Sequence, residues 1–266
     1  MTIRSRFRFD LIRIWSTVSI VLLSVPTAML LFYGLVIYRS PLGFGSPVFT
    51  SIELTLFSSA VAAAIVFIVF TPVAYQLSRQ RDDIIETASD IPVSIPHPII
   101  GISLLLLGSV YTPTGRFLHS IGFSFFYTIQ GMISALVMVS APIYIRSAQS
   151  LFSATNRDAE LFASSMGASR LRILYSILIP SSARNIVSAS LTTMGRAMSE
   201  YGAVAILAYY VLQRPFVGFE PAPVLIVEYY SVYGTAVAVT AASVMILFSI
   251  AVMIGVRAVR SRQNPW

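Results

Sequence analysis

Long apolar segments constrain the fold of this chain more than any other feature. A helix needs roughly 20 consecutive, mostly apolar residues to cross the hydrocarbon core of a bilayer. Segments near or above that length cover residues 15–38, 52–77, 91–111, 121–145, 186–209 and 232–256. We therefore predict an all-α integral membrane protein with six transmembrane helices, in which residues 1–266 form a single transmembrane domain.

The charged residues are too few to cover a soluble surface. They make up 11% of the chain and hydrophobic residues make up 56%, whereas an average soluble domain has about 25% charged residues. The absence of cysteine excludes disulfides and thiolate metal sites. All 18 basic residues are arginine, so the chain lacks the lysine of a nucleotide-binding P-loop and carries no ATPase site of that kind.

Arginine also sets the predicted orientation. With six spans, the loops on the side of both termini hold 14 arginines, the opposite loops hold three, and Arg196 lies inside the fifth segment. Basic residues collect in cytoplasmic loops, so both termini and the long 146–184 loop are predicted to be cytoplasmic. The same rule explains the net charge of +7 without nucleic acid as a partner.

Local patterns predict details of the second and third spans. Thr50 and Glu53 have capping-box spacing, which predicts the start of the second helix there. Prolines at positions 92, 96 and 98 predict a kinked third span whose unbroken part begins near Pro98, with broken or re-entrant helices as the alternative. The acidic run from Asp82 to Asp90 is expected to be a solvated loop, and contact with a partner protein is the less favoured interpretation.

The 146–184 loop contains a first short helix, predicted over residues 158–166. Four apolar side chains share one face of it: Ala159, Phe162, Ala163 and Met166. Asp158 and Glu160 lie in its first turn, where negative charge suits the helix dipole. Thr155 or Asn156 can cap its start, and Gly167 is expected to end it.

A second short helix is predicted over residues 169–179. Leu171, Leu174 and Leu178 share one face of it, and Pro180 is expected to stop it. Periodicity leaves two interpretations of the loop open: helices that pack on the protein's own membrane domain, or a docking surface for a partner.

The loop resembles the cytoplasmic signature of the permease subunits of binding-protein-dependent ABC importers. That signature reads E-A-A, three residues, G, nine residues and I-x-L-P. The matching positions here are Ala163, Gly167, Ile177, Ile179 and Pro180. Leu161 and Phe162 replace the usual glutamate and first alanine, and the acidic residues are instead Asp158 and Glu160.

Three further stretches extend the resemblance over most of the chain from about residue 50 onward. Residues 71–79 (TPVAYQLSR) resemble the end of the second span of these permeases, and residues 95–108 (IPHPIIGISLLLLG) resemble their proline-rich third span. Residues 195–208 (GRAMSEYGAVAILA) are similar to the Arg-Ala-x-x-Glu-Phe-Gly-Ala segment of the molybdate, tungstate and sulfate group, with Tyr201 in place of Phe.

The resemblance implies a type I ABC importer fold and a set of partners. It implies a homodimer of permeases, two ABC ATPase subunits that bind ATP and magnesium, an external substrate-binding protein, and the cell membrane of a prokaryote. This chain is then expected to be no enzyme and to bind no cofactor. Molybdate or tungstate is the expected substrate, with sulfate or thiosulfate as the alternative. The implied coupling residues are Asp158, Ala159, Glu160, Phe162, Ala163, Met166, Gly167 and Ala168.

Two charges lie inside the fifth apolar segment, Arg196 and Glu200, four residues apart on one predicted helix. Intramembrane charges are costly and are usually functional or paired. An arginine facing a pore would favour a dianion, but the favoured interpretation is a mutually neutralised pair that braces helix packing or a dimer contact. The candidates for the translocation path or the dimer contact are Thr192, Arg196, Ser199, Glu200 and Gly202.

Other classes of function have less support in the sequence. His97 and His119 lack ligand spacing, so no metal site is expected, and no nucleophile with an adjacent base indicates catalysis. An ATP-independent secondary transporter or channel is the alternative from another class. It would usually show intramembrane charges on several helices or an inverted repeat, and neither is evident.

Overall fold

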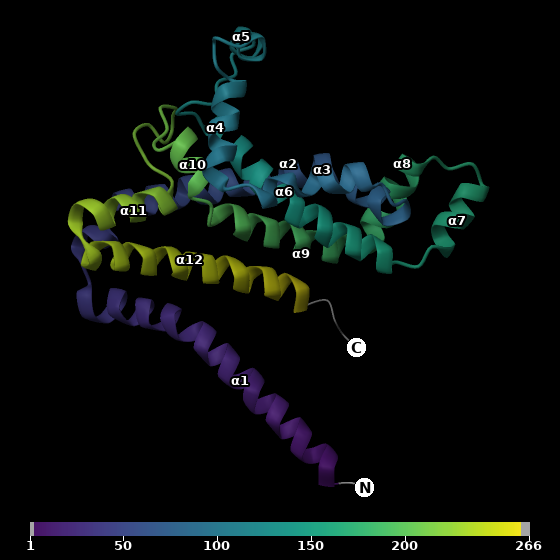
Figure 1. Cartoon of the computed structure of the whole chain (residues 1–266), viewed down its shortest axis with the longest axis horizontal. Helices are drawn as coiled ribbons and strands as arrows, with labels where there is room; N and C mark the ends of the chain where they lie inside the picture. The colour runs from purple at the N-terminus through teal and green to yellow at the C-terminus, as the bar shows by residue number, and fades with distance from the viewer. Residues whose placement is uncertain (1–2, 262–266) are drawn as a thin grey trace. The chain divides into compact units, whose positions relative to one another are not determined.

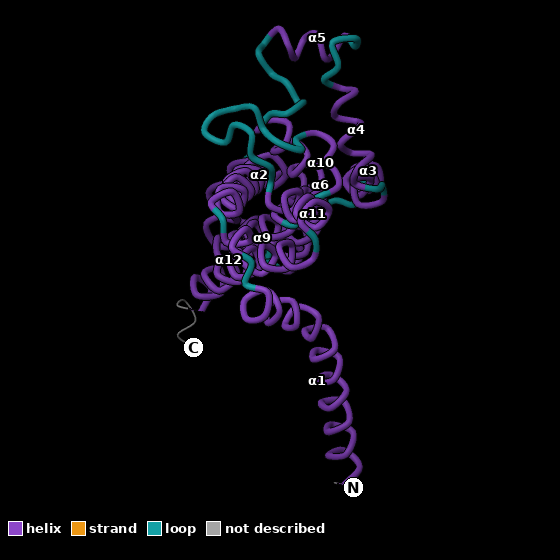
Figure 2. The backbone as a smooth tube through the Cα atoms, turned by 90° about the vertical axis from the view of Figure 1, so that its left-hand side faces the viewer, coloured by secondary structure: helices purple, strands orange, loops and turns teal. Residues whose placement is uncertain are grey.

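The computed structural model describes residues 3–261, with side chains placed for residues 11–255. Over these residues the backbone forms helices and loops without strands (Figure 2). The longer helices are α1 (Ile3–Phe32), α2 (Ser46–Arg79), α3 (Asp83–Ser94), α4 (His97–Leu107), α6 (Ile129–Ala154), α9 (Ile179–Met198), α11 (Ala222–Tyr233) and α12 (Thr235–Ser261). The shorter elements are α5 (Pro113–Ser120), α7 (Asp158–Ser165), α8 (Arg170–Ile173), α10 (Gly202–Leu207), the π-helices η1 (Tyr33–Tyr38) and η3 (Leu174–Leu178), and the 3₁₀ helix η2 (Pro41–Phe44).

Four of the described helices are long and apolar enough to cross a membrane: Leu11–Tyr38, Ser46–Arg79, Ile129–Ala154 and Thr235–Gly255. A fifth span arises if α3 and α4, which are bent by 108° at their break, count as one. The all-α membrane fold is therefore confirmed, and the count of six spans stays a prediction. Helix α9 is 20 residues long, but its serines, threonines, asparagine and arginines lower its hydropathy, so it is not among these candidate spans.

The contacts divide the chain into two compact units. One consists of Met1–Val48 with Ile226–Phe248, and the other of Phe49–Leu225 with Ser249–Trp266. In the first unit, α12 binds the end of α1 and η1 by polar contacts: the Ser243 hydroxyl donates to the Leu30 carbonyl at 3.0 Å and the Thr240 hydroxyl to the Gly34 carbonyl at 3.3 Å. The prediction of a single domain over residues 1–266 is not tested by this division.

Several predicted helix boundaries are wrong. Helix α2 already begins at Ser46, so Thr50 and Glu53 lie inside it and do not cap its start. The fourth apolar segment becomes helical at Ile129, where the Thr128 hydroxyl accepts a hydrogen bond from the Gly131 amide at 3.0 Å. Apolar composition alone does not mark these ends, because a helix starts where its first amides find acceptors.

The third apolar segment is divided between α3 and α4, with the break at Ile95 and Pro96. The predicted start of the unbroken part near Pro98 is close to the observed start of α4 at His97. The bend of 108° between the two helices is, however, larger than the kink that was predicted for a single span. Ile95, the residue before Pro96, is extended, as is favoured before a proline, and it separates the two helices.

The acidic run before this break is a helix and not a solvated loop, so that prediction is wrong. Asp82 caps α3 by accepting hydrogen bonds from the Ile84 and Ile85 amides. Two carboxylates one turn apart, Glu86 and Asp90, both form ion pairs with Arg146 of α6. The acidic side chains thus fix α3 against α6.

The fifth apolar segment is also broken. Helix α9 ends at Met198 and α10 begins at Gly202, so the predicted continuous span over residues 186–209 is wrong. Helix α9 begins at Ile179, before the predicted start at residue 186, and α8, η3 and α9 follow one another without a loop. Pro180 was expected to stop the second loop helix, but it lies in the first turn of α9, so this prediction is wrong. The π-helix η3 directly before it accommodates a residue without an N–H.

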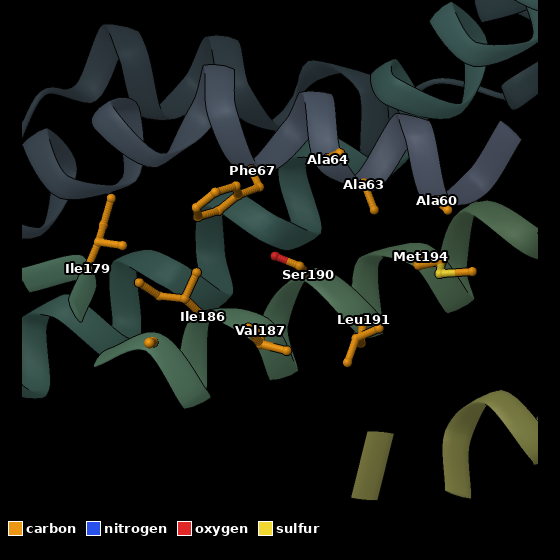
Figure 3. Close-up of a pocket in the computed structure, with 11 residues that line it drawn as sticks. Ala60, Ala63, Ala64, Phe67, Ile179, Ile186, Val187, Ser190, Leu191 and Met194 are labelled. Carbon is orange, nitrogen blue, oxygen red and sulfur yellow. The ribbon is translucent and has the colours of Figure 1, made fainter. Parts of the chain in front are cut away.

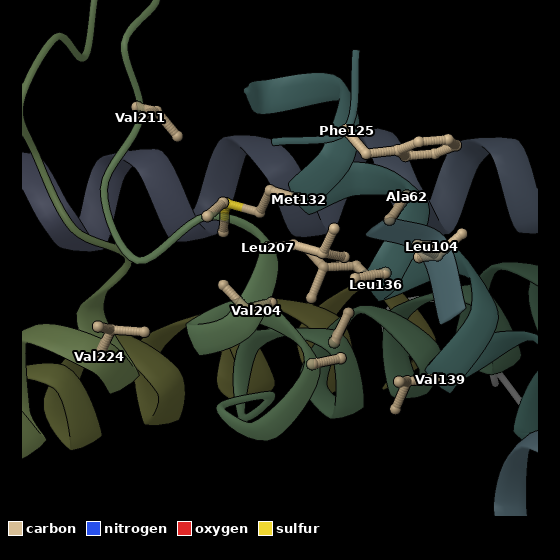
Figure 4. Close-up of a cluster of buried hydrophobic side chains, with 14 of the residues drawn as sticks. Ala62, Leu104, Phe125, Met132, Leu136, Val139, Val204, Leu207, Val211 and Val224 are labelled. Carbon is tan, nitrogen blue, oxygen red and sulfur yellow. The ribbon is translucent and has the colours of Figure 1, made fainter. Parts of the chain in front are cut away.

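Helices α4, α6 and α10 contribute much of the main apolar core of the second unit. Leu104, Met132, Leu136, Val204 and Leu207 are buried together there (Figure 4). The short helix α10 packs closely on α4, and α6 lies alongside α9 (Figure 1). The approach of α10 to α4 requires glycine at position 101, since a Cβ there would lie 2.8 Å from the Ala203 carbonyl oxygen. Helices α4 and α10, which are the second halves of the third and fifth apolar segments, therefore contact each other.

Candidate coupling and translocation sites

The coupling-helix candidate of the 146–184 loop forms α7, and its predicted end is confirmed. Gly167 has a φ of +82°, a conformation that glycine adopts without strain. The Gly167 amide donates to the Ser164 carbonyl and the Ala168 amide to the Ala163 carbonyl, both at 3.0 Å. These two bonds form a Schellman motif. At the other end, Asn156 accepts a hydrogen bond from the Asp158 amide at 3.0 Å.

One side chain of α7, Glu160, turns toward the membrane helices. It is 9% exposed and forms an ion pair with Arg79, the last residue of α2. The Tyr75 hydroxyl donates to Glu160 Oε2 at 3.0 Å and Arg79 Nε donates to the same oxygen at 3.1 Å. Arg79 Nη1 also donates to the Phe152 carbonyl at 2.7 Å. Arg79 therefore joins α7 to the ends of both α2 and α6.

The sequence analysis did not single out Arg79 or Tyr75. They lie more than 80 residues from Glu160 along the chain, and the hydrogen bonds that join them are visible only in three dimensions. A signal was present nevertheless. Glu160 is an acidic residue beside an apolar helix face, and Arg79 is a basic residue in the last turn of a long apolar helix.

The large exposed side chains of α7 and of the residue after it are apolar. Phe162 is 71% exposed, and Leu161, Met166 and Ala159 are exposed as well. Ala163 is half-buried and packs with Ala168 against the buried cluster of Tyr144, Phe152 and Leu174. The predicted apolar face is therefore divided, with Ala163 inward and Phe162 and Met166 outward. The helix therefore exposes its large apolar side chains and turns its glutamate toward its own protein, which is unusual for a surface helix.

A polar stripe follows the exposed side of α9. Its residues recur every three or four positions: Ser181, Asn185, Ser188, Thr192, Gly195 and Ser199. Two of the predicted path candidates, Thr192 and Ser199, belong to this stripe. No described atom lies within 4 Å of a Cβ built at Gly195, so this side of the helix is open in the single chain. Thr193, the next residue after Thr192, is instead buried.

The stripe ends at a cluster of ionisable side chains between the two breaks. Glu200 Oε2 lies 3.2 Å from Arg196 Nη2 and 2.9 Å from His97 Nδ1. Glu200 Oε1 accepts a hydrogen bond from the Ala203 amide, in the first turn of α10, at 3.0 Å. Gly202 lies against this cluster, since a Cβ there would be 3.1 Å from His97 Cβ. The predicted pair of Arg196 and Glu200 is thus formed, and His97, which the sequence analysis set aside, is its third member.

An apolar groove of about 510 Å³ lies between α2 and α9 (Figure 3). Small side chains line much of it, among them Ala60, Ala63, Ala64, Ala183 and Ser190. Small residues allow another apolar helix or a lipid chain to approach a helix pair closely. Within residues 3–261, no group of three or more His, Asp or Glu side chains could hold a metal ion.

The chain matches one protein family and resembles several known permeases. Residues 71–264 match the family described as "Binding-protein-dependent transport system inner membrane component". The molybdate/tungstate transport system permease protein WtpB of Thermococcus kodakarensis is 31% identical over 220 residues, which cover 82% of this chain and 81% of the relative. A probable sulfate transport system permease protein, cysT of Chlorokybus atmophyticus, is 29% identical over 74% of this chain and 66% of the relative.

A solved structure shares the fold. The MetNI methionine ABC transporter in inward-facing conformations has a chain that matches with a TM-score of 0.57 at 18% identity, covering 79% of this chain and 94% of that one. At this identity the likeness concerns the fold alone.

Proposed function

The chain belongs to the family of binding-protein-dependent transport system inner membrane components, and on that premise we propose that it forms the path of an ATP-driven importer for a tetrahedral divalent oxyanion. Molybdate or tungstate is the proposed substrate, and sulfate is the alternative. The observation that carries this proposal is the polar stripe of α9, which leads to Arg196 and His97. The names of relatives in the molybdate, tungstate and sulfate groups support it.

A path for such an anion requires a second copy of the chain. A charge of −2 is expensive to place in hydrocarbon, so the anion needs a wet route with polar walls. One α9 stripe provides one wall, and a homodimer would provide two that face each other. The small side chains of the α2–α9 groove support the same arrangement, since they allow apolar helices to pack closely.

Coupling to ATP hydrolysis is proposed to occur at α7. Its exposed Leu161, Phe162 and Met166 form an apolar patch, and a few such anchors can dominate a protein interface. The partner would be an ABC ATPase, which binds ATP and magnesium itself. An external binding protein would deliver the substrate and supply most of the selectivity.

The proposed orientation places both termini and α7 in the cytoplasm of a prokaryotic cell. The chain has no cysteine, so a single introduced cysteine can be labelled without background. We expect Ser46→Cys to react with a membrane-impermeant maleimide in intact cells and Ser153→Cys to react only after lysis. Both side chains are exposed in the structure. The opposite pattern would reverse the orientation and remove α7 from the ATPase.

Uptake by proteoliposomes that contain the permease, its ATPase and its binding protein tests the substrate. We expect ATP-dependent uptake of molybdate or tungstate, competition by the other of the two, and weaker competition by sulfate. Phosphate, a neutral sugar and an amino acid are the controls. Preferred uptake of a neutral solute would refute the oxyanion proposal, and uptake without ATP would favour a secondary transporter or channel.

A further inference from the structure

The carboxylate of Glu200 holds its partners with two separate oxygens. Oε1 accepts from the Ala203 amide at 3.0 Å, whereas Oε2 faces Arg196 Nη2 and His97 Nδ1. Loss of the Oε2 contacts would therefore leave Glu200 attached to α10. The same carboxylate can release its two basic partners without a change in the fold around it.

The basic partners, and not the carboxylate, reach the open side of α9. The Glu200 side chain is 1% exposed, while those of Arg196 and His97 are 27% and 32% exposed. Ser199 belongs to the polar stripe, and its hydroxyl accepts from Arg196 Nη1 at 3.3 Å. An anion that moves along the stripe would thus meet the Ser199 hydroxyl, the Arg196 guanidinium and the His97 imidazole before it meets Glu200.

These three groups suit a tetrahedral oxyanion. A guanidinium presents a planar fork of N–H donors, and an imidazole N–H adds a donor from another direction. The Ser199 hydroxyl donates to the Arg196 carbonyl at 2.9 Å and would add a third donor by turning from that carbonyl to the anion. Arg196 Nη2 lies 3.2 Å from His97 Nδ1 and 3.3 Å from Nε2, so one oxyanion can contact both side chains. Hydrogen bonds between such donors and an anion are the strong, charge-assisted kind.

We infer that Glu200 is a resident counter-ion, and that the transported oxyanion replaces its Oε2 on Arg196 and His97 during passage. This inference rests on the proposed function. Arg196, His97 and Ser199 then form a transient oxyanion site. The Glu200 carboxylate competes with the bound oxyanion for Arg196 and His97 and so promotes its release. A pathway must bind its ion strongly enough to admit it and weakly enough to release it. Competition from Glu200 supplies the second condition.

The test uses the complete permease–ATPase complex in nanodiscs, with radiolabelled molybdate as the probe and without the binding protein. Glu200→Gln keeps the side-chain size and an acceptor for the Ala203 amide but removes the competing charge. We expect it to retain about tenfold more molybdate than the wild type at equal concentration, and to slow uptake in the reconstituted system. Addition of Arg196→Gln or His97→Gln to Glu200→Gln should return retention to the wild-type level.

The matched control is Glu53→Gln, which removes an exposed carboxylate from α2 and should leave retention unchanged. Unchanged retention in an assembled Glu200→Gln complex would overturn the inference, because a carboxylate that only braces the helices has no effect on a bound anion. Retention that persists when Arg196→Gln is added would overturn it as well.

A second measurement remains if Glu200→Gln does not assemble. Ser199→Cys introduces a single cysteine into a chain that has none, and molybdate should slow the reaction of that cysteine with an anionic thiol reagent. The reaction of Ser46→Cys is the reference and should be unaffected. Absence of protection in a complex that transports molybdate overturns the inference alone, whereas a wild-type complex that transports no oxyanion overturns the proposed function.

Discussion

Arg79→Ala is expected to abolish coupled transport, since it removes the contact that joins α7 to the membrane helices. The substitution leaves Glu160 buried without its ion-pair partner and takes a donor from the Phe152 carbonyl. Breaking a buried ion pair by removal of one partner costs roughly 3–5 kcal/mol. We expect uptake to fall by more than about tenfold, while any complex that still assembles hydrolyses ATP without a response to substrate.

The neighbouring Arg81 provides the matched control. It pairs with Asp83, but both side chains are largely exposed, and such surface pairs contribute about 0–1 kcal/mol. Arg81→Ala should therefore transport normally. Uptake and substrate-stimulated ATP hydrolysis in proteoliposomes are the measurements. The exchange of charges in Arg79→Glu with Glu160→Arg should restore part of the activity, and normal coupling in Arg79→Ala would show that α7 is held by other contacts.

Phe162→Asp is expected to separate the permease from its ATPase. The side chain is highly exposed in the α7 apolar patch, so the substitution leaves the permease's own core intact. Burial of an unpaired carboxylate in an interface is strongly unfavourable, and loss of an anchor residue typically costs about 2 kcal/mol or more, roughly a thirtyfold loss of affinity. We expect the ATPase no longer to co-purify and ATP-dependent uptake to be lost.

Ser164→Asp is the control for this substitution. It places the same charge two residues away on the same helix, at a position that is also exposed. Its effect on helix stability should match that of Phe162→Asp, whereas its effect on ATPase binding should be small. If the ATPase co-purifies equally with both variants, the docking surface does not include Phe162.

The sequence by itself determined the class of protein, its family and the ends of the loop helix. The membrane class follows from apolar length and low charge, which depend on composition within each segment and not on distant partners. Gly167 could be assigned as the end of α7 because a left-handed residue after a helix favours glycine wherever the rest of the chain lies. The family signature is likewise a matter of local spacing.

Only the tertiary structure decided which way the polar side chains turn and where the helices break. Periodicity put Ala163 and Phe162 on one helix face without deciding whether that face packs on the protein or is exposed, and it passed over His97. Packing against the ends of α2 and α6 turns Ala163 and Glu160 inward and leaves Phe162 outward. Arg146 of α6 pairs with a carboxylate of α3, and Arg196 of α9 pairs with Glu200 beyond the end of that helix. Pairing lowers the cost of placing a charge in or near a membrane. Such partners are chosen by proximity in space, and a pattern read along the chain contains no information about that proximity.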